Sequence, residues 1–140
     1  MTGRLIQIKV NDKRDLDSMK TYQLIIVDDQ RRSRESLRAF LATWPAVGSI
    51  REAENGLMAL TLLEEHQPDL VLMDVRMPEM DGISAARQIK ERWPQVKIIA
   101  LSLYPDSLDE ARQAGADACI SKAEAPEKLL SIIETIFQIN

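Results

Sequence analysis

The stretch QLIIVDDQRRSRESLRAFLATW, residues 23–44, changes its hydrophobic pattern partway along. It begins with consecutive apolar residues that end at two acidic ones, Asp28 and Asp29. Such a run is typical of a strand in a parallel sheet, which helices cover on both faces. Beyond it, Leu37, Phe40 and Leu41 recur at helical spacing, opposite a face of Arg and Glu. The stretch therefore predicts a strand followed by an amphipathic helix.

The same alternation recurs along the rest of the chain. Apolar runs follow at LVLMD (70–74), KIIALS (97–102) and ACIS (118–121), and the more polar SIREAE (49–54) suits an edge strand. Helical patterns lie between them, at GLMALTLLEEH (56–66), ISAARQIKERW (83–93), DSLDEARQAGA (106–116) and EKLLSIIETIF (127–137). Asn55 and Asp106 are expected as helix caps, Gly115 as a helix stop, and Pro126 in a first turn. Alternating strands and helices predict an α/β fold of the (βα)5 type around a parallel sheet.

Composition limits the classes of protein to which the chain can belong. With 140 residues, 45% of them hydrophobic, it fits one domain with its own core. The net charge of −4 gives no electrostatic reason to expect direct nucleic-acid binding. The single cysteine, Cys119, excludes an intramolecular disulfide, and no Cys/His cluster suggests zinc. No apolar run approaches the roughly 18 residues that span a membrane, so we expect a cytoplasmic protein that does not enter the bilayer.

The first twenty residues differ in pattern from the rest of the chain. They contain one short apolar alternation and then the polar run NDKRDLDSMK, which has no sustained period. We interpret residues 1–20 as an N-terminal extension, either a strand or a flexible arm, and residues 21–140 as the folded domain. Met19 directly precedes the first strand and is an alternative natural start.

Polar residues stand where the predicted strands end: Asp28, Asp29, Asp74, Ser102 and Lys122. In an open parallel sheet, ligands bind at the carboxyl ends of the strands, so these side chains are expected to meet at one edge. Each has an ordinary alternative, because adjacent aspartates are often helix caps and a lysine or serine after a strand is usually a solvated loop residue. Their coincidence at four strand ends favours a site.

The three carboxylates of that set indicate a cation. Close carboxylates repel one another and raise their pKa values unless a positive ion neutralises them. Mg²⁺ is the natural partner, because it accepts carboxylate oxygens while keeping room for water and phosphate. With Lys122 and Ser102 added, the set has the charged clamp and hydroxyl needed for phosphoryl transfer.

The segment from Tyr22 to Phe137 resembles the receiver domain of bacterial two-component response regulators. IIVDDQ, LVLMDVRMPEMDG, IIALS and CISK match the motifs of that family in order. The resemblance implies a doubly wound, flavodoxin-like three-layer sandwich with parallel sheet order 2-1-3-4-5. SKAEAPEKLL is similar to the corresponding stretch in receivers of the LuxR-type class, in which a helix-turn-helix domain normally follows. The chain is then either a stand-alone receiver or a fragment of a transcription regulator.

The resemblance also implies a role for each site residue. Asp74 would accept a phosphoryl group from the phosphohistidine of a sensor histidine kinase, and the domain would act as a switch with at most autophosphatase activity. Phosphorylation-linked homodimers are common in the family. Mg²⁺ would be bound by Asp28, Asp29, Asp74 and the backbone carbonyl of Arg76. Ser102 would be the hydroxyl switch, and Lys122 would pair with the phosphate. Arg76 and Tyr104 would tune the lifetime of the phosphorylated state.

Two departures from the family pattern leave alternatives open. Many receivers carry an aromatic residue three positions before the lysine, where this chain has Cys119, and many carry proline directly after it, where this chain has Ala123. A pseudo-receiver that binds partners without phosphorylation therefore stays an alternative. A hydrolase of the haloacid-dehalogenase type would also use an Asp nucleophile and Mg²⁺, but DVR lacks the second acid of its DxD pattern.

Overall fold

A computed structural model describes residues 20–76 and 82–139 of the chain. Five strands form one sheet, β1 (Tyr22–Val27), β2 (Val47–Ala53), β3 (Leu70–Asp74), β4 (Lys97–Ser102) and β5 (Ala118–Ser121). Their order is β2-β1-β3-β4-β5, and every neighbouring pair is parallel. The predicted (βα)5 fold and sheet order are confirmed.

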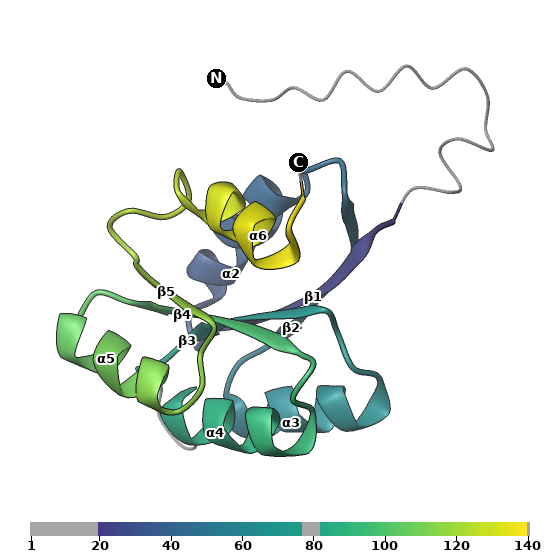
Figure 1. The fold of residues 1–140 in the computed structure, drawn as a ribbon. Helices are drawn as coiled ribbons and strands as arrows, with labels where there is room; N and C mark the ends of the chain where they lie inside the picture. The colour runs from purple at the N-terminus through teal and green to yellow at the C-terminus, as the bar shows by residue number, and fades with distance from the viewer. Residues whose placement is uncertain (1–19, 77–81, 140) are drawn as a thin grey trace, which may run out of the picture.

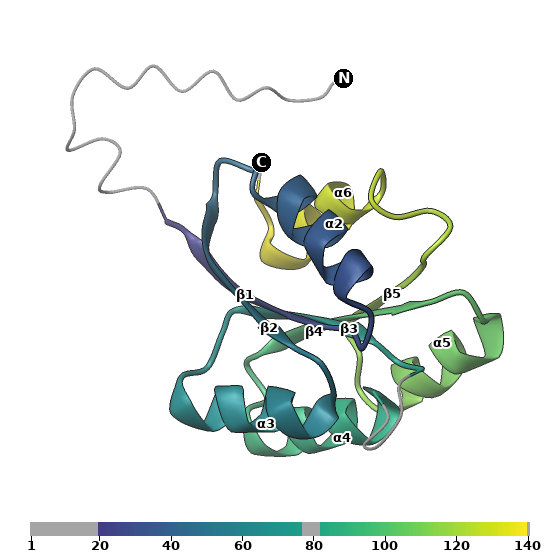
Figure 2. The ribbon, with the colours of Figure 1, turned by 180° about the vertical axis from the view of Figure 1, so that it is seen from behind.

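Helices cover both faces of this sheet (Figure 1). They are α2 (Arg31–Leu41), α3 (Gly56–Glu65), α4 (Gly82–Arg92), α5 (Pro105–Gln113) and α6 (Leu129–Phe137). Helices α2 and α6 lie on one face, and α3, α4 and α5 lie on the other, as the view from behind also shows (Figure 2). The molecule is thus a three-layer sandwich.

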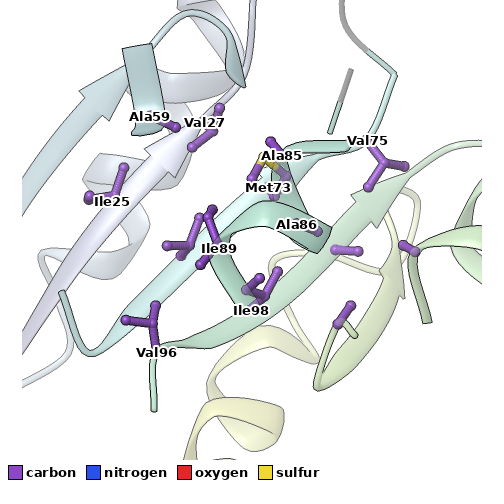
Figure 3. Close-up of a cluster of buried hydrophobic side chains, with 14 of the residues drawn as sticks. Ile25, Val27, Ala59, Met73, Val75, Ala85, Ala86, Ile89, Val96 and Ile98 are labelled. Atoms are coloured by element: carbon purple, nitrogen blue, oxygen red, sulfur yellow. The ribbon is translucent and has the colours of Figure 1, made fainter. Parts of the chain in front are cut away.

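Each face of the sheet has its own apolar core. Ile25 and Val27 of β1 point toward α3 and α4, where they meet residues such as Ala59 and Ile89 (Figure 3). Leu24 of the same strand belongs to the second cluster, beneath α2 and α6. Consecutive residues of a strand point to opposite faces, so a strand covered on both sides must be apolar at every position. This is why β1, β3 and β4 each contain an unbroken run of four apolar residues.

Two helix signals in the sequence are confirmed. The Asn55 side chain accepts a hydrogen bond of 2.8 Å from the backbone N–H of Met58 and caps α3. Gly115 follows α5 with a φ of 113°, a left-handed conformation that residues with a Cβ rarely adopt.

Other element boundaries differ from the prediction. Helix α5 begins at Pro105 with Tyr104 as its N-cap, so Asp106 lies in the first turn and is not the cap. Helix α6 begins only at Leu129, because backbone bonds such as Glu124 N–H to Ser121 carbonyl hold the preceding residues in turns. Strand β2 starts at Val47 rather than at Ser49.

The segment predicted as an N-terminal extension, residues 1–20, lies almost wholly outside the described residues. Within residues 20–76 and 82–139, no helix combines the length and apolarity that a membrane crossing requires.

Candidate functional site

The polar residues predicted at the strand ends meet at one edge of the sheet. Strand β1 lies between β2 and β3, and the chain leaves it toward α2 on one face while β3 leads to the opposite face. This reversal at β1 and β3 is the place where doubly wound folds bind ligands. A cavity of about 620 Å³ opens there, and its lining includes Asp29, Asp74, Ser102 and Lys122.

Three carboxylates form the acidic part of this site. One oxygen from each of Asp28, Asp29 and Asp74 lies within 4.8 Å of the others. Asp28 is 1% exposed and Asp74 is 5% exposed, whereas Asp29 is open to solvent. Neither Asp28 nor Asp29 caps α2, whose N-cap is Gln30. The alternative interpretation of this pair as helix caps is therefore wrong.

Local hydrogen bonds fix the two buried carboxylates. Asp28 Oδ1 accepts the Gln30 N–H at 2.9 Å, and Asp74 Oδ1 accepts the Arg76 N–H at 3.0 Å. Both are turns in which an aspartate bonds to the backbone two residues further on. Each turn leaves the second carboxylate oxygen to face the site.

Lys122 lies between those second oxygens. Its Nζ is 3.1 Å from Asp28 Oδ2 and 3.0 Å from Asp74 Oδ2, although the lysine lies 94 residues after Asp28 in the chain. Its backbone N–H donates to the Ser102 carbonyl at 2.9 Å, which fixes the start of the loop after β5. The ammonium group thus acts as the counterion of the acidic cluster.

Burial and pairing shift the two central pKa values. Burial is the main influence on the pKa of Asp74 and raises it, and repulsion from Asp28 adds a smaller rise. The hydrogen bond from the Arg76 N–H and the contact with Lys122 lower the pKa, but the net result lies above 3.8. Burial alone would lower the pKa of Lys122, but hydrogen bonds and charge attraction to Asp74 and Asp28 together outweigh it, so the pKa lies above 10.5. Desolvation, more than the carboxylate repulsion expected from the sequence, is what makes the Asp74 charge unfavourable.

The donor set suits Mg²⁺. Three carboxylates, two of them buried and one exposed, and one ammonium leave a formal excess of two negative charges at the site. Mg²⁺ binds hard oxygen ligands and keeps several waters of its own, so it needs a site that is open on one side, as this one is toward the cavity. The residues present therefore fit the ion that the sequence predicted.

Ser102 and Arg76 border the same cavity. The Ser102 hydroxyl is buried and accepts the Tyr104 N–H at 2.9 Å, so its own proton is available to another acceptor. The Arg76 guanidinium stacks on the Tyr104 ring, 4.4 Å from its centroid, and lies 3.4 Å from the Ser107 hydroxyl. The predicted use of the Arg76 backbone carbonyl as a metal ligand stays a prediction.

Sequence patterns missed two residues that support this site. The helical pattern predicts that Arg34 lies on the polar face of its helix, yet it is only 9% exposed and donates to the Asp28 carbonyl at 2.8 Å. The buried Ser107 hydroxyl, in the first turns of α5, is the second. No signal in the sequence distinguishes Arg34 from its neighbours Arg31 and Arg32.

Cys119 occupies the position where many receivers have an aromatic residue. Its side chain packs against the core beneath α3, α4 and α5, and its Sγ lies 3.4 Å from the Leu108 carbonyl oxygen. Burial raises the pKa of the thiol, which keeps it neutral. The residue is therefore a half-buried part of the packing between β5 and α5.

Comparison with known proteins agrees with this fold and site. Residues 24–134 match the response regulator receiver domain. The uncharacterized transcriptional regulatory protein YhcZ of Bacillus subtilis is 44% identical over 110 residues, which are 77% of this chain and 51% of that protein. A LuxR-family response regulator from Aurantimonas has a TM-score of 0.78 at 29% identity, covering 84% of this chain and 85% of that one. The CheX–CheY–BeF3–Mg complex from Borrelia burgdorferi gives 0.78 at 25% identity, over 86% and 92%.

The structure defines a class of protein: a doubly wound α/β domain with an acidic pocket at the point between β1 and β3 where the chain changes faces of the sheet. This chain belongs to the family of response regulator receiver domains, whose members are regulatory switches rather than conventional enzymes. The chain spans about half the length of the curated relatives it matches.

Proposed function

We propose that this chain accepts a phosphoryl group on Asp74 from the phosphohistidine of a sensor histidine kinase. A carboxylate oxygen of Asp74 forms a bond to phosphorus, the bond from phosphorus to the imidazole nitrogen breaks, and that nitrogen takes up a proton. The observation that supports this most directly is the Asp74 carboxylate held between the Arg76 N–H and Lys122 at the edge of the cavity. Bound Mg²⁺ would screen the repulsion between that carboxylate and the incoming anion.

The surrounding residues then convert the modification into a change of shape. Lys122 exchanges its contact with Asp74 for the new phosphoryl oxygens, and the Ser102 hydroxyl donates its proton toward them. Because Ser102 also accepts the Tyr104 N–H, its movement pulls on the loop that begins α5. A local charge event thereby biases a two-state surface. Hydrolysis of the acyl phosphate resets the switch, and Arg76 stacked on Tyr104 limits the access of water.

The output of this switch is transcription regulation, through a separate output partner or domain. Relatives described as transcriptional regulatory proteins support this interpretation. Residues 21–140 are the receiver in this proposal, and residues 1–20 are an extension to it. The domain works in the cytoplasm, where kinases present phosphohistidine, without contacting DNA itself. A phosphorylation-linked homodimer through the exposed side of α6 is part of the same proposal.

The direct test is phosphorylation by a small donor. Incubation with acetyl phosphate and Mg²⁺ should add one phosphoryl group to the intact mass, and Asp74→Asn should abolish the adduct. Asp106→Asn, which alters an exposed carboxylate outside the site, is the matched control and should still be phosphorylated.

Other results would point to the alternatives. Absence of any adduct in the wild-type protein, or of any shift on adding beryllofluoride, would favour a phosphorylation-independent pseudo-receiver. Rapid turnover of diverse phosphate esters would instead indicate a hydrolase. Removal of Mg²⁺ by a chelator should prevent the adduct without unfolding the protein.

A further inference from the structure

We propose that Arg34 is a positioning residue for the metal site, because it orients the peptide group that joins Asp28 to Asp29. The proposal rests on the Mg²⁺ binding assigned above. Arg34 lies in α2, and its side chain is 11% exposed. One arm of the guanidinium, Nη1, donates to the Asp28 carbonyl at 2.8 Å, while Nε donates to Glu52 Oε1 at 3.0 Å.

The Asp28 carbonyl determines where Asp29 stands. The Asp28 N–H donates to the Ala53 carbonyl at 3.1 Å, so the chain entering Asp28 is fixed by the sheet. The peptide leaving it is planar, and turning its carbonyl necessarily moves the Asp29 nitrogen and Cα. Within residues 20–76 and 82–139, the Asp29 carboxylate makes no hydrogen bond or ion pair. Two hydrogen bonds therefore hold the backbone around this exposed ligand: the one from Arg34 to the Asp28 carbonyl, and the one from the Gln30 N–H to Asp28 Oδ1.

Arg34 is itself held rigidly. Glu52, in the edge strand β2, accepts hydrogen bonds from both Arg34 and Arg38, and the hydrogen bond from Arg38 is the main cause that lowers the pKa of Glu52. The carboxylate therefore stays ionised at neutral pH. Arginine serves the carbonyl and the carboxylate from separate donors of one rigid planar fork, whereas a lysine would have to reach both from a single point charge.

A purely structural role for Arg34 would be to fasten α2 to β2. Arg38 already does this, since it binds Glu52 Oε2 at 2.5 Å and the Ile50 carbonyl at 2.8 Å without touching Asp28. The two arginines share a helix and the acceptor Glu52, but Arg34 is 11% exposed and bonds to the Asp28 carbonyl, whereas Arg38 is 45% exposed and bonds to the Ile50 carbonyl. Arg38 is thus a matched control for Arg34.

The experiment is a Mg²⁺ titration of the full chain by calorimetry, with Arg34→Lys, Arg34→Gln and Arg38→Gln compared with the wild type. We expect both Arg34 variants to bind Mg²⁺ on the order of 5- to 20-fold more weakly, as when one charge-assisted hydrogen bond is lost, and Arg38→Gln to stay within about twofold. Removing a positive charge alone would favour cation binding. Weaker binding by Arg34→Gln therefore cannot arise from charge, and Arg34→Lys retains the charge.

A second measurement separates positioning from stability. Without Mg²⁺, hydrogen exchange at the Gln30 amide, which donates to Asp28 Oδ1, should be faster in Arg34→Lys than in Arg38→Gln, at temperatures where melting curves show both folded. Equal Mg²⁺ affinity in the Arg34 variants and the wild type would overturn the inference and leave the proposed function intact. If the wild-type protein bound no Mg²⁺, the proposed function would fail, and the positioning role with it.

Discussion

Replacing Lys122 by methionine is expected to destabilise the Mg²⁺-free protein and, at the same time, to strengthen Mg²⁺ binding. The ammonium group is the partner of two buried carboxylates, those of Asp28 and Asp74. Breaking a buried ion pair costs about 3–5 kcal/mol, and because Lys122 is itself 23% exposed we expect about 2–3 kcal/mol. Methionine keeps much of the side-chain length, so the change reports the charge.

The gain in Mg²⁺ affinity has the same cause. Lys122 neutralises part of the negative charge that a metal ion would otherwise neutralise, and its own positive charge repels the ion at close range. Its removal should strengthen binding roughly tenfold, the effect of one unit charge near a partly shielded site. Urea denaturation with a chelator and a Mg²⁺ titration by calorimetry measure the two quantities.

The pH dependence of this effect depends on the two shifted groups. Asp74 has a raised pKa, so the stability that comes from its protonated form is complete below pH 3.8 and is lost as the pH rises through its folded pKa. Lys122 opposes that loss, and its own contribution disappears only above 10.5, as the pH rises through its folded pKa. The difference in the free energy of unfolding between the wild type and Lys122→Met should therefore be larger at neutral pH than below pH 3.8.

Lys128 offers the control. It forms an exposed pair with Glu124, four residues earlier in the turns before α6, at 2.6 Å. Solvent screens such pairs, so Lys128→Met should change neither stability nor Mg²⁺ affinity appreciably. Equal behaviour of the Lys122 and Lys128 variants would show that the contacts of Lys122 carry no energetic weight.

The sequence predicts those parts of the molecule in which the hydrophobic pattern of a strand and the polar residue at its end indicate the same place in the fold. Strand β3 is apolar at each position before Asp74, and a carboxylate directly after such a run must lie at the carboxyl edge of a parallel sheet. The same reasoning placed Ser102 and Lys122. The topology of a parallel sheet brings these side chains together at its carboxyl edge, so their meeting can be predicted without knowing any side-chain contact.

What the sequence could not predict depends on particular hydrogen bonds, some of them tertiary and some local. Arg34 looks like any arginine of a polar helix face, and it is buried only because Glu52 and the Asp28 carbonyl lie opposite it. Likewise, Pro126 suggested a helix start, but turns after β5 delay α6 until Leu129. A long-range contact decides the burial of Arg34, whereas local turn bonds such as Glu124 N–H to the Ser121 carbonyl decide where α6 begins.

Changing Gly82 to alanine is expected to be severely destabilising, for a reason that involves Asp74 directly. Gly82 begins α4 and lies close to the backbone of Asp74, the last residue of β3. A Cβ added there would lie 2.5 Å from both the Asp74 carbonyl oxygen and the Val75 Cα, which are backbone atoms that cannot rotate away. Either α4 or the acceptor strand must shift, and overpacking of this kind costs typically about 1–3 kcal/mol, here toward the upper end.

Gly48→Ala provides the comparison, because its closest contact is also 2.5 Å but is made by the Gln23 Nε2 atom, the end of a flexible side chain. That variant should therefore lose less stability in urea denaturation. Gly82→Ala should also accept phosphate from acetyl phosphate more slowly, since the backbone of Asp74 is displaced while its carboxylate is intact. Equal stability of the two alanine variants would mean that α4 moves freely relative to β3. In that case the glycine after the acceptor loop would not be required for the close approach of α4 to the phosphorylation site.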